Sequence, residues 1–111
     1  MIVLTNDKQT TISKSISLKG IGIHTGKEVN LTFKPAGPDN GYTFKRIDLK
    51  DNPVIEANIK YVINTDRRTF LKKDNVTIQT CEHVLAALVG LEIDNVKIEI
   101  DASEPPIMDG S

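Results

Sequence analysis

Alternation of apolar and polar residues predicts β-strands along most of this chain. The clearest run is 96–100, Val-Lys-Ile-Glu-Ile, and residues 28–34, Glu-Val-Asn-Leu-Thr-Phe-Lys, repeat the pattern. Successive side chains of a strand point to opposite faces, so each run has one apolar and one polar face. In the region 54–64 we expect Ile59, Tyr61 and Ile63 to form one row. The other predicted strand regions are 10–18, 42–47, and a hairpin of 69–71 with 76–78 around a turn at 72–75.

Residues 80–90, Thr-Cys-Glu-His-Val-Leu-Ala-Ala-Leu-Val-Gly, break this alternation and predict a short helix. Thr80 suits the N-cap position, where its hydroxyl oxygen would accept a hydrogen bond from one of the first unpaired backbone N–H groups. Gly90 suits the C′ position, because glycine tolerates the left-handed conformation that ends many helices. Apolar residues at three- and four-residue spacings form the face expected to pack on the sheet: Cys81, Val84, Leu85 and Leu88.

One helix and several strands predict an α+β fold, a two-layer sandwich in which a mostly antiparallel sheet is covered on one face by the helix. A helix of about ten residues is only about 15 Å long, whereas five strands extend over about 20 Å. We therefore expect part of the apolar sheet face to be bare and chains to pair through it. Asp109 and Ser111 are good N-cap residues, so the sequence is expected to stop just before a second helix. The sheet face in question is formed by Val29, Leu31, Phe33, Val96, Ile98 and Ile100.

Composition places the chain among ordinary soluble proteins. It has 111 residues, 39% of them hydrophobic and 26% charged, with a net charge of −1. This length suits a single domain, and the charge balance argues against nucleic acid or an anionic membrane surface as a partner. The single cysteine fits a reducing compartment, and no segment has the pattern of a secretion signal or a membrane span. These features predict a cytoplasmic protein.

The adjacent pair Glu82 and His83 is the candidate for chemistry. Both fall in the first turn of the predicted helix, where the positive end of the helix dipole favours a carboxylate and disfavours a protonated imidazole. A neutral imidazole beside an ionised carboxylate is what a metal site with an adjacent base requires. The simpler interpretation is a capping glutamate beside a structural histidine, and the pair alone does not separate the two.

Three motifs together favour the catalytic interpretation. They are Gly20-x-Gly22-x-His24-Thr25-Gly26, Thr80-x-Glu82-His83-x-x-x-Ala87-Leu88 and Pro106-Ile107-Met108-Asp109-Gly110-Ser111. In this order and spacing the chain resembles the amino-terminal part of UDP-3-O-acyl-N-acetylglucosamine deacetylase, the zinc enzyme of lipid A synthesis in Gram-negative bacteria. The resemblance implies that His83 is the first zinc ligand and Glu82 the general base. It implies an active-site supporting role for His24 and a functional or structural role for Asp109.

The same resemblance implies that residues 1–111 form one domain, the amino-terminal half of a two-domain enzyme. The family's other two zinc ligands and its general-acid histidine belong to the second domain, and this chain has only His24 and His83 as histidines. The expected reaction of the whole enzyme is hydrolysis of the N-acetyl group of UDP-3-O-acyl-N-acetylglucosamine. Residues 1–111 alone are expected to be inactive.

One stretch departs from the family pattern, and two other interpretations of the chain stay open. Residues 66–70, Asp-Arg-Arg-Thr-Phe, stand where the family often has small or sulfur-containing residues. The first alternative is a short non-catalytic binding or assembly module with the same fold. The second is an unrelated α+β structural domain.

Overall fold

The computed structural model describes residues 2–4, 9–22, 26–64, 69–79 and 82–106. Its largest sheet has five strands in the order β3, β4, β10, β5, β6. The bounds of these strands are β3 Ile16–Ile21, β4 Glu28–Pro35, β5 Tyr42–Arg46, β6 Val54–Glu56 and β10 Val96–Ile100. Strand β10 is central; it pairs antiparallel with β4 and parallel with β5. The pairings β3–β4 and β5–β6 are antiparallel, so the sheet is mostly antiparallel, as predicted.

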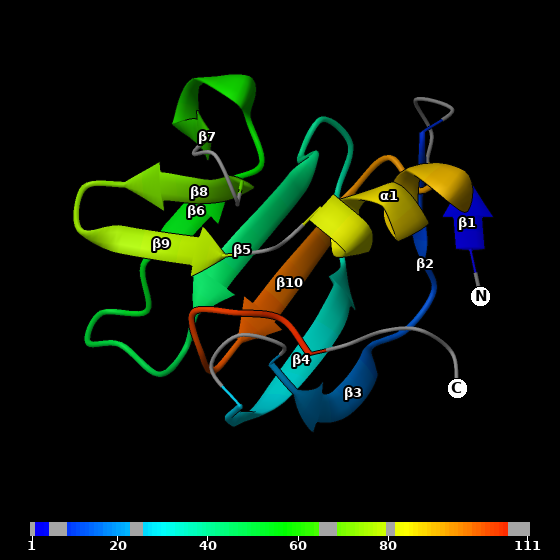
Figure 1. Cartoon of the computed structure of the whole chain (residues 1–111). Helices are drawn as coiled ribbons and strands as arrows, with labels where there is room; N and C mark the ends of the chain where they lie inside the picture. Colours follow the sequence, from blue (N-terminus) through cyan, green and yellow to red (C-terminus); the bar gives the residue numbers. More distant parts are fainter. Residues whose placement is uncertain (1, 5–8, 23–25, 65–68, 80–81, 107–111) are drawn as a thin grey trace.

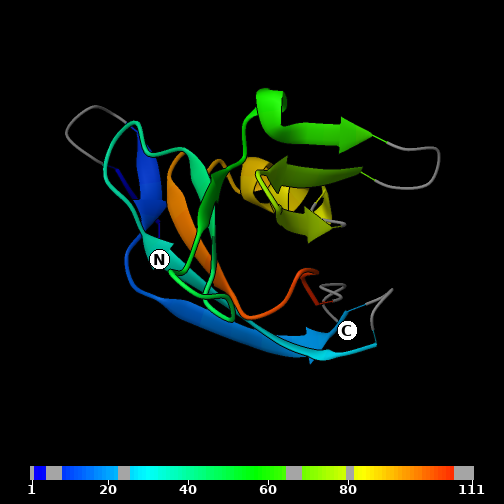
Figure 2. The same ribbon diagram turned by 90° about the vertical axis from the view of Figure 1, so that its left-hand side faces the viewer.

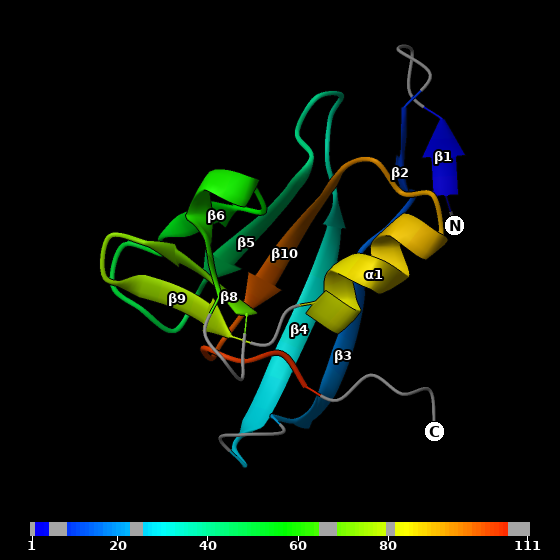
Figure 3. The same ribbon diagram turned by 45° about the horizontal axis from the view of Figure 1, so that its top comes forward.

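A second layer lies on one side of this sheet (Figure 2). It consists of the helix α1, Glu82–Gly90, and a three-stranded antiparallel sheet. Figure 3 shows α1 over the half of the large sheet that holds β3 and β4, with the small sheet over the half that holds β5 and β6. The strands of the small sheet are β7 Val62–Asn64, β8 Thr69–Lys73 and β9 Val76–Gln79. The predicted α+β two-layer sandwich is therefore confirmed.

The apolar face of the large sheet is covered, so the prediction of a bare face was wrong. The residues named for that face have exposed fractions between 0% and 8%. Besides Val84 and Leu88 of α1, the covering layer contributes Leu71 and Ile78 from the hairpin β8–β9, which are 2% and 0% exposed. The helix alone is too short to cover this face, and the small sheet covers the remainder. Because this face is buried within the chain, we no longer expect chains to pair through it.

Two of the predicted strand regions each divide into elements of different sheets. The region 10–18 bends at Ser13 and Lys14 into β2, Thr10–Ile12, which pairs with β1, Ile2–Leu4, and into β3 of the large sheet. The region 54–64 contains β6, the 3₁₀ turn Ile59–Tyr61 and β7, so the predicted row at 59, 61 and 63 was wrong.

Asn58 explains the break in the region 54–64. Its side-chain oxygen accepts the N–H of Lys60 at 3.1 Å, and its carbonyl accepts the N–H of Tyr61 at 2.9 Å. Such local bonds offer the backbone an alternative to the ladder of a sheet. The chain uses this turn to pass from the large sheet to the small one.

The end of α1 differs from the prediction, because the left-handed residue is Glu92 and not Gly90. Gly90 is still helical, and Glu92 takes the left-handed conformation with φ of 59°. The N–H of Glu92 donates to the carbonyl of Val89, and the N–H of Ile93 donates to the carbonyl of Leu88, both at 3.0 Å. This is a Schellman motif with Glu92 at C′, accompanied by the buried apolar pair Leu88 and Ile93. Thr80 and Cys81, predicted as N-cap and first apolar residue, lie outside the described residues.

Gly90→Ala is expected to raise the free energy of unfolding by about 0.5–1 kcal/mol, because alanine has the higher helix propensity. A Cβ at Gly90 meets nothing within 4 Å. Glu92→Gly should also stabilise the chain, since a side chain at a left-handed residue costs about 1–2 kcal/mol. Urea unfolding followed by circular dichroism measures both variants. A destabilised Gly90→Ala variant would instead place the left-handed residue at Gly90.

Candidate functional site

The first turn of α1 presents Glu82 and His83 side by side. Glu82 is exposed, whereas His83 is half-buried. An exposed carboxylate at a helix N-terminus is stabilised by the unpaired N–H groups of the first turn. Glu82 therefore faces solvent, and His83 is the member of the pair that packs against the fold.

A hydrogen bond from a distant segment fixes the imidazole of His83. Its Nε2 lies 3.1 Å from the carbonyl oxygen of Pro106, which is 23 positions further along the chain. A carbonyl oxygen only accepts hydrogen bonds, so Nε2 must carry the proton. In the neutral ring the lone pair then belongs to Nδ1. Histidines that bind metals commonly donate their other N–H to a backbone carbonyl in this way.

The three sequence motifs meet at this point. Gly22 of the first motif forms an isolated antiparallel bridge with Pro106 of the third, and Pro106 bonds His83 of the second. Gly22 also closes a turn, because its N–H donates to the carbonyl of Lys27 and its carbonyl accepts from Gly26, both at 3.0 Å. The structure thus brings together three segments that are far apart in the sequence, with His83 lying 23 residues before Pro106 and Gly22 much further upstream. His24 and Asp109, the other predicted site residues, lie outside the described residues.

Glu104, which lies two residues before Pro106, was not among the residues predicted for the site. Its side chain is 0% exposed, and Pro105 and Pro106 are also buried. Glutamate is rarely fully buried, so no signal in the sequence marks this position.

Arg46 forms an ion pair with Asp48 and a hydrogen bond that connects the large sheet to the hairpin β8–β9. Arg46, at the end of β5, donates from Nε and Nη2 to the two carboxylate oxygens of Asp48 at 2.9 and 2.8 Å, and from Nη1 to the carbonyl of Thr77 at 2.9 Å. Hydrogen bonding from Arg46 lowers the pKa of Asp48, its positive charge acts in the same direction, and partial burial opposes them. The bond to Thr77 ties β9 to the end of β5.

Asp48→Asn is expected to destabilise the chain by about 1 kcal/mol at neutral pH, the upper range for a partly exposed ion pair. Because the folded-state pKa of Asp48 is lowered, the carboxylate stabilises the fold above its unfolded pKa of about 3.9 and loses that effect as pH falls through the folded value. The difference between variant and wild type should therefore shrink below about pH 4. Urea unfolding between pH 3 and 7 measures it. Glu28→Gln is the matched control, because the Lys19–Glu28 pair is 63% and 61% exposed and should contribute little.

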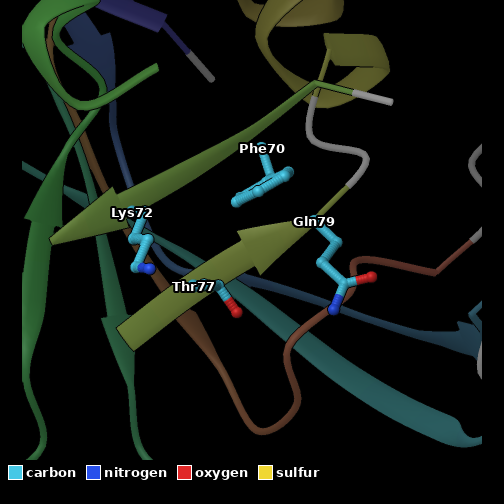
Figure 4. Close-up of a pocket in the computed structure, with 4 residues that line it drawn as sticks. All are labelled: Phe70, Lys72, Thr77 and Gln79. Carbon is cyan, nitrogen blue, oxygen red and sulfur yellow. The ribbon is translucent and has the colours of Figure 1, made fainter. Parts of the chain in front are cut away.

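A groove of about 300 Å³ lies on the outer face of the hairpin β8–β9 (Figure 4). Phe70 pairs with Gln79 and Lys72 with Thr77 in the strand register, and these four side chains line the groove. They alternate with Leu71 and Ile78, which face the core. The lining by described residues includes neither Glu82 nor His83, so we assign the groove no part in the chemistry of the pair.

The described residues contain no cluster of three potential metal ligands. Within that same part of the chain, no helix is long and apolar enough to cross a membrane.

A comparison with protein families matches residues 9–111 to the model described as LpxC, UDP-3-O-acyl N-acetylglycosamine deacetylase. The bifunctional enzyme LpxC/FabZ of Chlorobaculum tepidum is 50% identical over 103 residues, which are 93% of this chain and 22% of that protein. The UDP-3-O-acyl-N-acetylglucosamine deacetylase of Myxococcus xanthus is 48% identical over 103 residues, 93% of this chain and 33% of its own length. The protein of the same name from Wigglesworthia glossinidia brevipalpis is 48% identical over 105 residues, 94% of this chain and 35% of its own length. The chain thus spans between a fifth and about a third of the relatives it matches.

Proposed function

Since this chain belongs to the UDP-3-O-acyl N-acetylglycosamine deacetylase family, we propose that it is the amino-terminal part of a zinc-dependent hydrolase. The full-length enzyme would remove the N-acetyl group of UDP-3-O-acyl-N-acetylglucosamine in lipid A synthesis, in the cytoplasm of a Gram-negative bacterium. The observation that carries this proposal is the pair of Glu82 and His83 at the start of α1, with His83 held by the carbonyl of Pro106.

The donor chemistry of His83 fits a metal ligand. With Nε2–H donated to Pro106, the ring is restrained and Nδ1 keeps an available lone pair. Zinc, when bound, would lower the pKa of a water molecule and polarise the acetamide carbonyl. His83 would supply one of its protein ligands. The others would come from outside this chain.

Glu82 would act as the general base. It is exposed, adjacent to His83, and lies in the first turn of α1. Its role would be to accept a proton from water as that water attacks the acetamide carbonyl, which requires hydrogen-bond reach. Cleavage of the C–N bond, with a proton supplied to the leaving nitrogen by the general-acid histidine that the resemblance assigns to the second domain, would then yield acetate and the free amine of the UDP-sugar. His24 and Asp109 complete the proposal as supporting residues of the same site.

The outer face of α1 supports a role for the rest of the protein. Beyond Glu82 and His83 the helix carries no charged residue, and both Ala86 and Ala87 are exposed. Val89 is 65% exposed, and Leu91, just after the helix, is 59% exposed. A helix that is apolar on all sides is normally covered on all sides. We propose that the part of the full-length protein outside this chain packs on this face and brings its zinc ligands to His83.

The full-length protein is expected to release acetate from UDP-3-O-acyl-N-acetylglucosamine, to lose this activity on dialysis against a chelator, and to regain it with one equivalent of zinc. Mass spectrometry of the product and metal analysis measure the two effects. A gene in which a stop codon follows Ser111, together with no release of acetate, would favour the non-catalytic binding module.

A further inference from the structure

We propose that the step Asn40–Gly41 is a deamidation site that Asn95 keeps closed in the folded chain. It is the single Asn-Gly step in the sequence. Glycine after asparagine favours this modification, because a residue without Cβ leaves its backbone nitrogen unhindered. The step lies in the turn between β4 and β5, at the end of β4 away from Gly22. The inference is independent of the proposed function.

Deamidation begins when the backbone nitrogen of Gly41 attacks the side-chain carbonyl carbon of Asn40. The new C–N bond closes a five-membered imide, the bond from that carbon to Nδ2 breaks, and the freed nitrogen leaves as ammonia with the proton that Gly41 loses. Water then opens the imide at either carbonyl, which gives aspartate or isoaspartate at position 40. The first step therefore needs a Gly41 nitrogen without a fixed partner and an Asn40 side chain that can turn toward it.

Asn95 occupies the nitrogen of Gly41. The N–H of Gly41 donates to Oδ1 of Asn95 at 2.8 Å, across 54 positions of the sequence. Asn95 is 1% exposed, so this bond is shielded from water and is stronger than it would be in solution. Asn95 is itself held by Gln9, which accepts from its Nδ2 at 2.7 Å. Its backbone N–H donates to the carbonyl of Thr10 at 3.0 Å, and its carbonyl accepts from the hydroxyl of Thr11 at 2.6 Å.

The orientation of the amide side chains in this network follows from two backbone donors. A backbone N–H can only donate, so the atom of Asn95 that faces Gly41 is its oxygen. The N–H of Asp39 likewise donates to Oε1 of Gln9 at 2.8 Å, and Nε2 of Gln9 donates to Oδ1 of Asp39 at 2.8 Å. Each donor in this network faces an acceptor. The acceptor in front of the Gly41 nitrogen is therefore fixed in identity as well as in position.

The side chain of Asn40 is also restrained. Its Nδ2, the nitrogen that would leave, donates to the carbonyl of Gly41 at 3.0 Å and to that of Val96 at 3.4 Å. The N–H of Asn40 donates to the carbonyl of Gly37 at 3.3 Å, which closes the turn. Closure of the imide would break these bonds as well as the bond between Gly41 and Asn95.

Modification at position 40 would reach the centre of the large sheet. The carbonyl of Gly41 accepts the N–H of Val96 at 2.9 Å, and the next residue, Tyr42, begins the parallel pairing of β5 with β10 opposite Val96. Figure 3 shows the starts of β5 and β10 side by side. Isoaspartate adds one carbon atom to the backbone just before β5 and a negative charge beside Asp39. Both changes would disturb the first pair of the central strands.

The test incubates the full-length protein in mildly alkaline buffer and follows residue 40 by mass spectrometry of the peptide that contains it. Folded wild type should deamidate much more slowly than the same protein unfolded in guanidinium chloride. Asn95→Ala removes the acceptor and should deamidate about tenfold faster than folded wild type, the change expected for the loss of one buried hydrogen bond. Tyr42→Phe is the matched control, because it removes the bond from the Tyr42 hydroxyl to the carbonyl of Ile93 and leaves the bond between Gly41 and Asn95. It should lower the melting temperature without changing the rate of deamidation.

Hydrogen exchange tests the bond in wild type without any variant, and the amide of Gly41 should exchange slowly. Fast exchange of this amide, or deamidation of folded wild type at the rate of the unfolded protein, would overturn the proposal, and both measurements decide it even where Asn95→Ala does not fold. So would an unchanged rate in a folded Asn95→Ala variant. Equal acceleration by Tyr42→Phe would also overturn it, because general loosening of the turn would then be the cause.

Discussion

In the full-length protein, Glu82→Gln is expected to lower the rate of deacetylation by about 10²–10⁴-fold, the usual contribution of a general base. Zinc content should stay at one equivalent, because Glu82 acts on water and is not a ligand in the proposal. His83→Ala should lose both zinc and activity, since it removes one of the three protein ligands of a catalytic zinc. Retention of zinc in the first variant and loss of zinc in the second would distinguish a general base from a metal ligand at neighbouring positions.

Glu92→Gln is the matched control for Glu82→Gln. It makes the same change in an exposed glutamate just beyond the opposite end of α1, and it should leave rate and zinc content unchanged. Steady-state rates and metal analysis on purified protein measure all three variants. Full activity in Glu82→Gln would refute the base assignment, and loss of zinc from that variant would show that Glu82 contributes to metal binding.

The strands could be predicted from the sequence where one side of the sheet faces solvent. In β10 the side chains of Val96, Ile98 and Ile100 are 0% exposed, whereas Lys97 on the other face is exposed. A sheet with one buried and one solvated face leaves this alternation in the sequence. Alternation does not tell which sheet a strand joins, however. For this reason the turn after Asn58 and the second, small sheet were not predicted.

The candidate site was predictable as a set of residues but not as an arrangement. Glu82 and His83 are adjacent in a recognisable helix start, so their position follows from local pattern. The hydrogen-bond partner of His83 is the carbonyl of Pro106, 23 residues away. Every residue has a backbone carbonyl, so no residue type in the sequence marks this acceptor. The end of α1 shows the same limit, because the choice of Glu92 over Gly90 depends on the contact of Ile93 with the core.

Phe44→Ala is expected to lower the free energy of unfolding of this chain by about 3–5 kcal/mol. Phe44 is 0% exposed on β5, in register with Ile98 of β10 on one side and Ile55 of β6 on the other, and both are also 0% exposed. The deletion therefore opens a cavity in the middle of a row that crosses the sheet. A domain of this size is typically stable by only about 5–15 kcal/mol, so most of that margin would be lost.

Phe70→Ala makes the same deletion on the hairpin β8–β9, where the ring is half-buried and lines an open groove. Its expected cost is about 1 kcal/mol, because the site is already in contact with solvent and the lost burial is small. Urea unfolding of the two variants, followed by circular dichroism, compares them directly. Since the small sheet and α1 both pack on the row that contains Phe44, its loss should also reduce zinc binding by the full-length protein, whereas Phe70→Ala should not. Equal destabilisation by the two variants would contradict the core described for this fold.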